Sequence, residues 1–164
     1  YWYLPLFLLM WGILIFVSWL VKKMPLITGG GIPQTRGVIN GRVAYKHPFI
    51  EVIAKFVGGI LALSTGLSLG REGPSVQIGS YVGCLVSKWG RVLAGERKQL
   101  LAAGAGAGLG AAFAAPLASS LLVIESIERF DAPKTAITTL LAGVVAGGVA
   151  SWLFPINPLS LIHI

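Results

Sequence analysis

The chain has 164 residues, of which 55% are hydrophobic and only 12% are charged. Soluble domains average about 25% charged residues, so this composition argues against a soluble domain and favours a single membrane domain. The net charge of +7 does not indicate a nucleic-acid-binding surface, because the basic residues fall between apolar runs, as they do in loops beside membrane helices.

The first predicted element is a transmembrane helix over residues 1–21, an uncharged run with aromatic residues at its start. It does not resemble a secretory signal, because its basic residues follow the apolar run. The chain opens on Tyr1 without a methionine, so we expect a piece of a longer protein. Pro25 and the glycines after it are expected to end the helix. The sequence GGGIP at 29–33 predicts a flexible turn that opens a short helix, and residues 34–45 read as a polar connector at the membrane surface.

A helix is predicted over 48–69, with Glu51 and Lys55 as an i,i+4 pair at a solvated helix end. After it, Pro74 suits the first turn of another helix, because the missing proline N–H needs no partner there. A helix over 74–89 would be about 24 Å long at 1.5 Å per residue, shorter than the roughly 30 Å hydrocarbon core. The uncharged part of the preceding helix is shorter still. We therefore predict two short helices that meet at a glycine break inside the membrane.

The run 99–124 contains Pro116 and predicts two helices joined near Ala115. Its glycine-rich segment matches the G-x-G-x-x-A pattern of dinucleotide-binding loops at 106–111, but no strand precedes it. The glycines instead fit a small-xxx-small spacing, which lets membrane helices pack closely. A last membrane helix, with glycines in the same spacing, is predicted over 135–154.

Arg71 and Glu72 lie in the predicted break, between Gly70 and Gly73-Pro74, within an otherwise uncharged stretch. A lone charge at the bilayer centre costs about 2.5–3.5 kcal/mol, whereas a helix N-terminus returns only about 0.3–1 kcal/mol to a carboxylate. Water, a bound ion or mutual pairing must supply the rest. The free N–H groups of the following helix attract anions, so Glu72 could compete with a bound anion, gate the site and carry a proton. The alternative is an Arg71–Glu72 pair that only closes a loop at the interface.

Three stretches carry a family resemblance, in order along the chain. GGGIP at 29–33, GREGPSVQIGS at 70–80 and GAGAGLGAAFAAPLASSLLVIESI at 104–127 resemble signatures of the CLC chloride channel and transporter family. The resemblance covers residues 5–155. It implies an all-α, polytopic membrane fold with broken half-membrane helices, corresponding to most of the family's first inverted repeat. Residues 1–164 are then a partial CLC transmembrane domain that lacks the first helices of this repeat and the whole second repeat.

The resemblance also implies an anion site and its gate. Glu72 would be the external gate, and backbone amides around it would form the outer anion site. The serine of the family's GSGIP motif, which donates its hydroxyl to the central anion, is replaced by Gly30, so only backbone donors remain there. The implied anion-binding residues are Gly29, Gly30, Gly31, Ile32, Pro33, Gly70, Arg71, Glu72, Gly73 and Pro74.

The proton path departs from the pattern of the family. Its exchangers usually carry two adjacent glutamates after the F-x-x-P turn, the second being the inner proton-transfer site, whereas this chain reads Glu125-Ser126. Serine does not titrate near neutral pH, so these two residues predict at most a weak proton pathway. The sequence therefore favours a channel, with a chloride/proton antiporter of the same family as the alternative. Glu125 could instead form an i,i+4 pair with Arg129.

The predicted function is transport of chloride, or of a halide- or nitrate-like anion, with no cofactor and no enzymatic activity. The expected partners are the lipid bilayer of a plasma or bacterial inner membrane and a second copy, bound through the helices after Gln99 and Thr135. A membrane enzyme is disfavoured, because His47 and His163 are isolated, Asp131 is the only aspartate, and no metal site is indicated. A more distant alternative, a broken-helix cation-coupled solute transporter, would need acidic or carbonyl-rich breaks, whereas these breaks expose helix N-termini.

Overall fold

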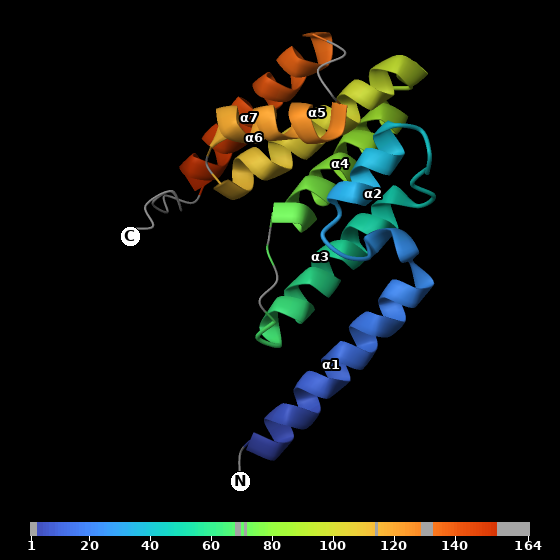
Figure 1. Ribbon diagram of the computed structural model, residues 1–164, viewed down its shortest axis with the longest axis vertical. Helices are drawn as coiled ribbons and strands as arrows, with labels where there is room; N and C mark the ends of the chain where they lie inside the picture. Colours follow the sequence, from blue (N-terminus) through green and yellow to red (C-terminus); the bar gives the residue numbers. More distant parts are fainter. Residues whose placement is uncertain (1–2, 68–69, 71, 114, 129–132, 154–164) are drawn as a thin grey trace.

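The computed structural model describes residues 3–67, 70, 72–113, 115–128 and 133–153, and within these ranges it contains helices and no strands. The predicted all-α architecture is confirmed. Figure 1 shows most helices packed together at one end of the molecule, with one long helix extending away from them. The elements are α1 (Tyr3–Lys23), η1 (Pro25–Ile27), α2 (Ile32–Ile39), α3 (Pro48–Ser64), α4 (Glu72–Trp89), α5 (Ala94–Phe113), α6 (Pro116–Val123), η2 (Ile124–Glu128) and α7 (Pro133–Leu153).

Two helices, α1 and α7, are long and apolar enough to cross a membrane. α1 buries none of its residues and lies beside α3 (Figure 1), with Leu20 against Gly58. α7 packs on α5 and α6. The first and last predicted membrane helices therefore form, close to their predicted limits. The apolar surface of α1 is too large to stay in water and suits lipid or another part of a membrane protein.

The centre of the fold is a contact between α4 and α5 that is made backbone to backbone through glycines. A Cβ on Gly79 would overlap the carbonyl oxygen of Gly104, and a Cβ on Gly104 would overlap that of Gly79. On another face of α5, a Cβ on Gly106 would lie 2.5 Å from the Thr139 methyl group of α7. These contacts confirm that the glycines of residues 104–110 serve helix packing and do not form a dinucleotide loop.

The break between α3 and α4 forms where it was predicted, with shifted edges. α3 ends earlier than predicted, because Gly66 adopts a left-handed conformation with a φ of 78° and the Thr65 hydroxyl donates to the Ala62 carbonyl over 2.7 Å. α4 begins at Glu72, so Pro74 lies in its first turn, where no N–H is needed. Figure 1 shows α4 beginning near the middle of the long axis of the molecule.

The other predicted joints also form. GGGIP opens α2, with Gly31 as its N-cap. The segment predicted as a connector is partly helical, because α2 continues to Ile39 and only residues 40–47 link it to α3. The predicted joint near Ala115 separates α5 from α6, and η2 continues α6 as a π-helical turn.

Candidate functional site

The two predicted helix breaks meet in space although they are far apart in the sequence. A Cβ on Gly73 would overlap the carbonyl oxygen of Gly30, so the first turn of α4 lies directly against the glycine turn that precedes α2. This approach requires a residue without a side chain at position 73. Gly70 lines the same cavity as Gly29 and Gly30. Tertiary packing thus combines both glycine segments into one site.

The cavity beside this contact has a volume of about 310 Å³ and lies between α1 and α3. Its walls are apolar side chains of α1, small residues of α3 and the three glycines, and among the described lining residues Lys55 is the one charged side chain. The N–H groups in the first turns of α2 and α4 have no intrahelical partner, and helix N-termini favour negative charge. The glycine segments that precede these two helix starts border the cavity, and its described lining residues include one cation and no acidic side chain. These surroundings suit a small anion.

Two buried side chains hold the segment before α2 by its carbonyl groups. Lys55 Nζ donates to the carbonyl oxygen of Ile27 over 2.8 Å and to that of Gly29 over 2.7 Å. Gln77 Nε2 donates to the carbonyl oxygen of Leu26 over 2.6 Å. These three bonds compensate the negative ends of the carbonyl dipoles beside the cavity, which would otherwise repel an anion.

Position 31 requires a glycine, both for its backbone conformation and for the space around it. Its φ of 86° lies in the left-handed region that favours glycine. A Cβ at this position would also lie 2.7 Å from the Gln77 Cβ. Gln77 therefore fixes the glycine turn twice, by its bond to Leu26 and by its contact with Gly31. Ile32 and Pro33 form the first turn of α2.

The prediction that Glu51 and Lys55 lie at a solvated helix end is wrong. Only 6% and 5% of their surfaces are exposed, and their polar atoms turn to different partners. Glu51 Oε1 accepts a hydrogen bond from the His47 backbone N–H over 3.3 Å, whereas Lys55 reaches the carbonyl groups before α2. A stripe of small residues at helical spacing on the same face could have predicted that this part of α3 is buried. The stripe consists of Ala54, Gly58 and Ala62.

Glu72 is the first residue of α4, and its side chain is exposed. It therefore lies at the helix N-terminus as predicted, while its role as a gate stays a prediction. Arg71, and with it the alternative of an Arg71–Glu72 pair, lies outside the described residues. In η2, Glu125 is exposed and Ser126 is half-buried. The predicted partner of Glu125, Arg129, also lies outside the described residues.

A buried polar cluster that the sequence analysis did not predict adjoins the glycine turn. The rings of Tyr45 and Tyr81 pack with their centroids 4.2 Å apart. The Tyr45 hydroxyl donates to Ser80 Oγ over 3.4 Å and lies 3.5 Å from the Thr35 hydroxyl. Gln77 Nε2 donates to the Tyr81 hydroxyl over 3.2 Å. Burial raises the pKa of the Tyr45 hydroxyl, so this group stays neutral and able to donate.

A family model described as voltage gated chloride channel matches residues 13–164. The chain belongs to the CLC family. This confirms the resemblance that the three glycine-containing motifs predicted.

Relatives of this CLC chain have names that specify exchange. The H(+)/Cl(-) exchange transporter ClcA of Citrobacter koseri is 38% identical over 154 residues, covering 92% of this chain and 32% of the relative. ClcA of Vibrio cholerae is 37% identical over 154 residues, covering 90% of this chain and 33% of the relative. A crystal structure described as a slow cyanobacterial Cl-/H+ antiporter matches with a TM-score of 0.78 and 34% identity, covering 89% of this chain and 35% of that one. The CLC chain therefore spans about a third of the length of these relatives.

Proposed function

We propose that the complete protein containing this chain is an integral membrane transporter that exchanges chloride for protons. The observation that carries the proposal is the contact of the two glycine breaks at the N-termini of α2 and α4, beside a cavity that contains Lys55. The names of the relatives support exchange over the channel that Ser126 had favoured. They also name transporters, which agrees with the expectation of no enzymatic activity.

In the proposed mechanism, a chloride ion binds the free N–H groups at the two helix starts, with Lys55 adding positive charge to the cavity wall. The Glu72 carboxylate competes for the same donors because it begins α4. Protonation removes its charge, so the neutral side chain leaves the donors to the anion and carries a proton with it. The Gly30 position supplies backbone donors only, so we propose that nitrate and other halides bind nearly as well as chloride.

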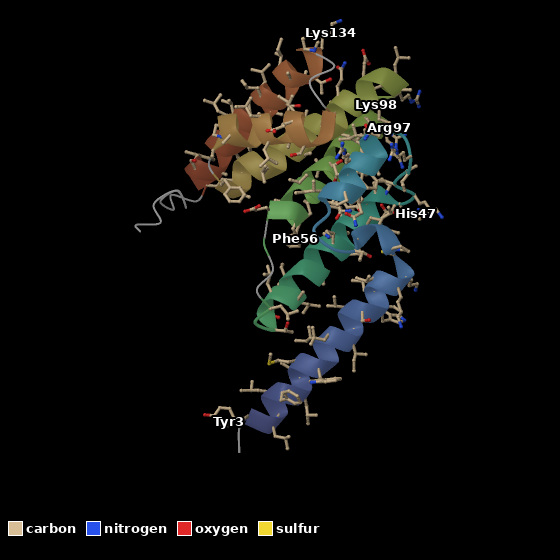
Figure 2. All side chains as sticks on the ribbon, in the orientation of Figure 1. Tyr3, His47, Phe56, Arg97, Lys98 and Lys134 are labelled. Carbon is tan, nitrogen blue, oxygen red and sulfur yellow. The ribbon has the colours of Figure 1, made fainter. Side chains whose placement is uncertain are left out.

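The distribution of basic residues suggests how the chain sits in the bilayer. Figure 2 shows Arg97, Lys98, Lys134 and His47 toward the end of the molecule away from Tyr3. Basic residues beside membrane helices favour the cytoplasmic side, so we propose that this end faces the cytoplasm of a plasma or bacterial inner membrane. The second copy in a homodimer would pack on the long helices α5 and α7.

The test is chloride-driven proton movement by the complete protein in liposomes. An outward chloride gradient is expected to drive proton uptake at a fixed ratio of chloride to protons. Glu72→Gln is expected to abolish proton uptake and to remove the pH dependence of chloride efflux. Passive chloride efflux without proton movement in the unmodified protein would contradict exchange, and efflux that kept its pH dependence in Glu72→Gln would contradict the gate. Residues 1–164 alone are expected not to transport, because most of the transporter is missing.

A further inference from the structure

Among the described residues, one carboxyl group is buried and has no role in the proposed anion site. Among the acidic side chains that the structure describes, Glu72, Glu96 and Glu125 are exposed, and Glu51 is buried. One carboxyl oxygen of Glu51 accepts the His47 backbone N–H. The other, Oε2, is buried without a hydrogen-bond partner in the described part of the chain. A buried carboxyl oxygen in this state requires a proton or a water molecule.

Unpaired buried acceptors recur on the elements around the glycine turn. In the described residues four buried side-chain atoms lack a partner. Three of them, Gln34 Oε1, Glu51 Oε2 and Gln77 Oε1, belong to α2, α3 and α4, which pack around the turn, whereas the fourth lies on α7. Gln77 is fully buried, and a Cβ on Gly31 would lie 2.5 Å from its Oε1. Water is the small donor that could satisfy these atoms.

The titratable groups around Glu51 come from the elements that pack on α3. The connector supplies Tyr45, and α4 supplies Tyr81, whose ring packs on that of Tyr45. Lys55, one turn further along α3, is held by two carbonyl groups. α1 contributes no buried residue, and η1 contains no titratable residue. Lys55 of α3 and Gln77 of α4 both bind the segment before α2, and Glu51 and Tyr81 each lie one helical turn from them on these two packed helices. The tyrosine hydroxyls can both donate and accept hydrogen bonds.

Glu51, Tyr81 and Gln77 lie on two packed helices, and α4 leads from the two polar side chains to Glu72 at its start. Glu51 lies one turn from His47, which Figure 2 shows on the side where Arg97 and Lys98 lie. Along α4, Tyr81 lies about 14 Å and Gln77 about 8 Å from Glu72, at 1.5 Å per residue. A buried hydroxyl group and a buried amide group thus lie on α4 between its C-terminal end and Glu72.

We propose that Glu51 is the inner proton-binding residue of this transporter, in place of the glutamate that Ser126 replaces. The inference rests on the proposed exchange function. Glu51 takes up a proton from the solution at the basic surface and becomes a neutral acid. The proton passes through water held by Tyr81 and Gln77 to the Glu72 carboxylate, and Glu51 returns to its ionised form. One proton moves per cycle, and no other reactant is consumed.

The test compares three glutamate variants of the complete protein in liposomes, with chloride efflux and chloride-driven proton uptake recorded on the same preparation. Glu51→Gln is expected to lower proton uptake by about 100-fold or more, the effect of losing a positioned proton-transfer group, while chloride efflux continues. Glu96→Gln, an exposed acid on α5, is the matched control and is expected to retain both fluxes. Glu125→Gln is expected to retain both as well. Coupled proton uptake in Glu51→Gln, or its loss in Glu125→Gln, would overturn the inference.

A second variant covers the case in which Glu51→Gln does not fold. Tyr81→Phe keeps the ring contact with Tyr45 and removes one hydroxyl, and it is expected to slow proton uptake several-fold at an unchanged rate of chloride efflux. Proton uptake at the wild-type rate in Tyr81→Phe would then count against the inference. Absence of proton uptake in the unmodified protein would overturn the exchange proposal together with this inference, whereas uptake that persists in the variants would overturn this inference alone.

Discussion

Replacing Gly104 with alanine is expected to separate α4 from α5, because the two backbones touch where no side chain fits. An alanine Cβ would overlap the Gly79 carbonyl oxygen, and it would lie 2.9 Å from the Gly79 carbonyl carbon and 3.1 Å from the Gly83 nitrogen. Carbon atoms in good contact lie about 3.5–4.0 Å apart. The helices would therefore have to move apart by roughly 1 Å at their most extensive contact.

The size of the effect follows from the cost of overpacking a tightly packed interior. Such insertions typically destabilise proteins by about 1–3 kcal/mol, occasionally more. Gly108 and Ser75, one turn along the same contact, are also in backbone contact and leave little freedom for relaxation. The fall in melting temperature is about 2–4 °C per kcal/mol for 150–250 residues, and it is smaller for a longer chain because the entropy of unfolding grows with length. A fall of a few degrees is therefore expected in the complete protein.

The assay is thermal unfolding of the complete protein in detergent, followed by intrinsic fluorescence. Gly95→Ala on the same helix is the matched control, because nothing lies within 4 Å of a Cβ at that position. It is expected to melt at or slightly above the wild-type temperature, since alanine favours helix over glycine. Equal melting temperatures for Gly104→Ala and Gly95→Ala would refute the assignment of this contact as the tight centre of the fold.

Three further predictions concern the candidate anion site and are measured by calorimetric anion binding to the complete protein. Lys55→Met removes the donor of two carbonyl groups, and leaving each of them unpaired costs about 1–3 kcal/mol. This variant is expected to bind chloride more weakly, and an unchanged affinity would contradict the role given to Lys55. Gly31→Ala is expected to weaken chloride binding more than Gly29→Ala, because both positions have a positive φ but only Gly31 contacts Gln77. Equal losses of affinity would contradict a role of the Gly31–Gln77 contact in anion binding. Gly30→Ser has room for its side chain and is expected to raise the preference for chloride over nitrate, and an unchanged preference would argue against a side-chain donor at this position.

Local patterns were sufficient to predict the helices and where they break. Proline and glycine change the backbone conformation and hydrogen bonding within their own helical turn. The break before α4 and the joint at Ala115 could therefore be predicted without any tertiary contact. Glycine spacing on α5 likewise predicted close packing, because residues three and four apart share a helix face. The ends of the helices differ from the predicted ones where a capping contact forms. One example is the Thr65 hydroxyl, which bonds to the Ala62 carbonyl at the early end of α3.

The roles of Glu51, Lys55 and Gln77 could not be predicted, because they depend on partners far away in the sequence. The i,i+4 spacing of Glu51 and Lys55 is equally compatible with a solvated pair and with two buried side chains. Only the packing of α3 against η1 and α4 brings Lys55 to the Ile27 carbonyl. The same packing brings Gln77 to the turn before α2.

The sequence by itself determined the membrane class, the family and the positions of the two glycine breaks, since each depends on composition or on short motifs. Tertiary structure alone decided that the breaks touch at Gly30 and Gly73, that Lys55 is buried beside them, and that Glu51 is buried one helical turn from Lys55. The physical reason is that helix starts and stops are local properties of the backbone. Burial and hydrogen bonding across helices depend on which faces meet after the chain has folded.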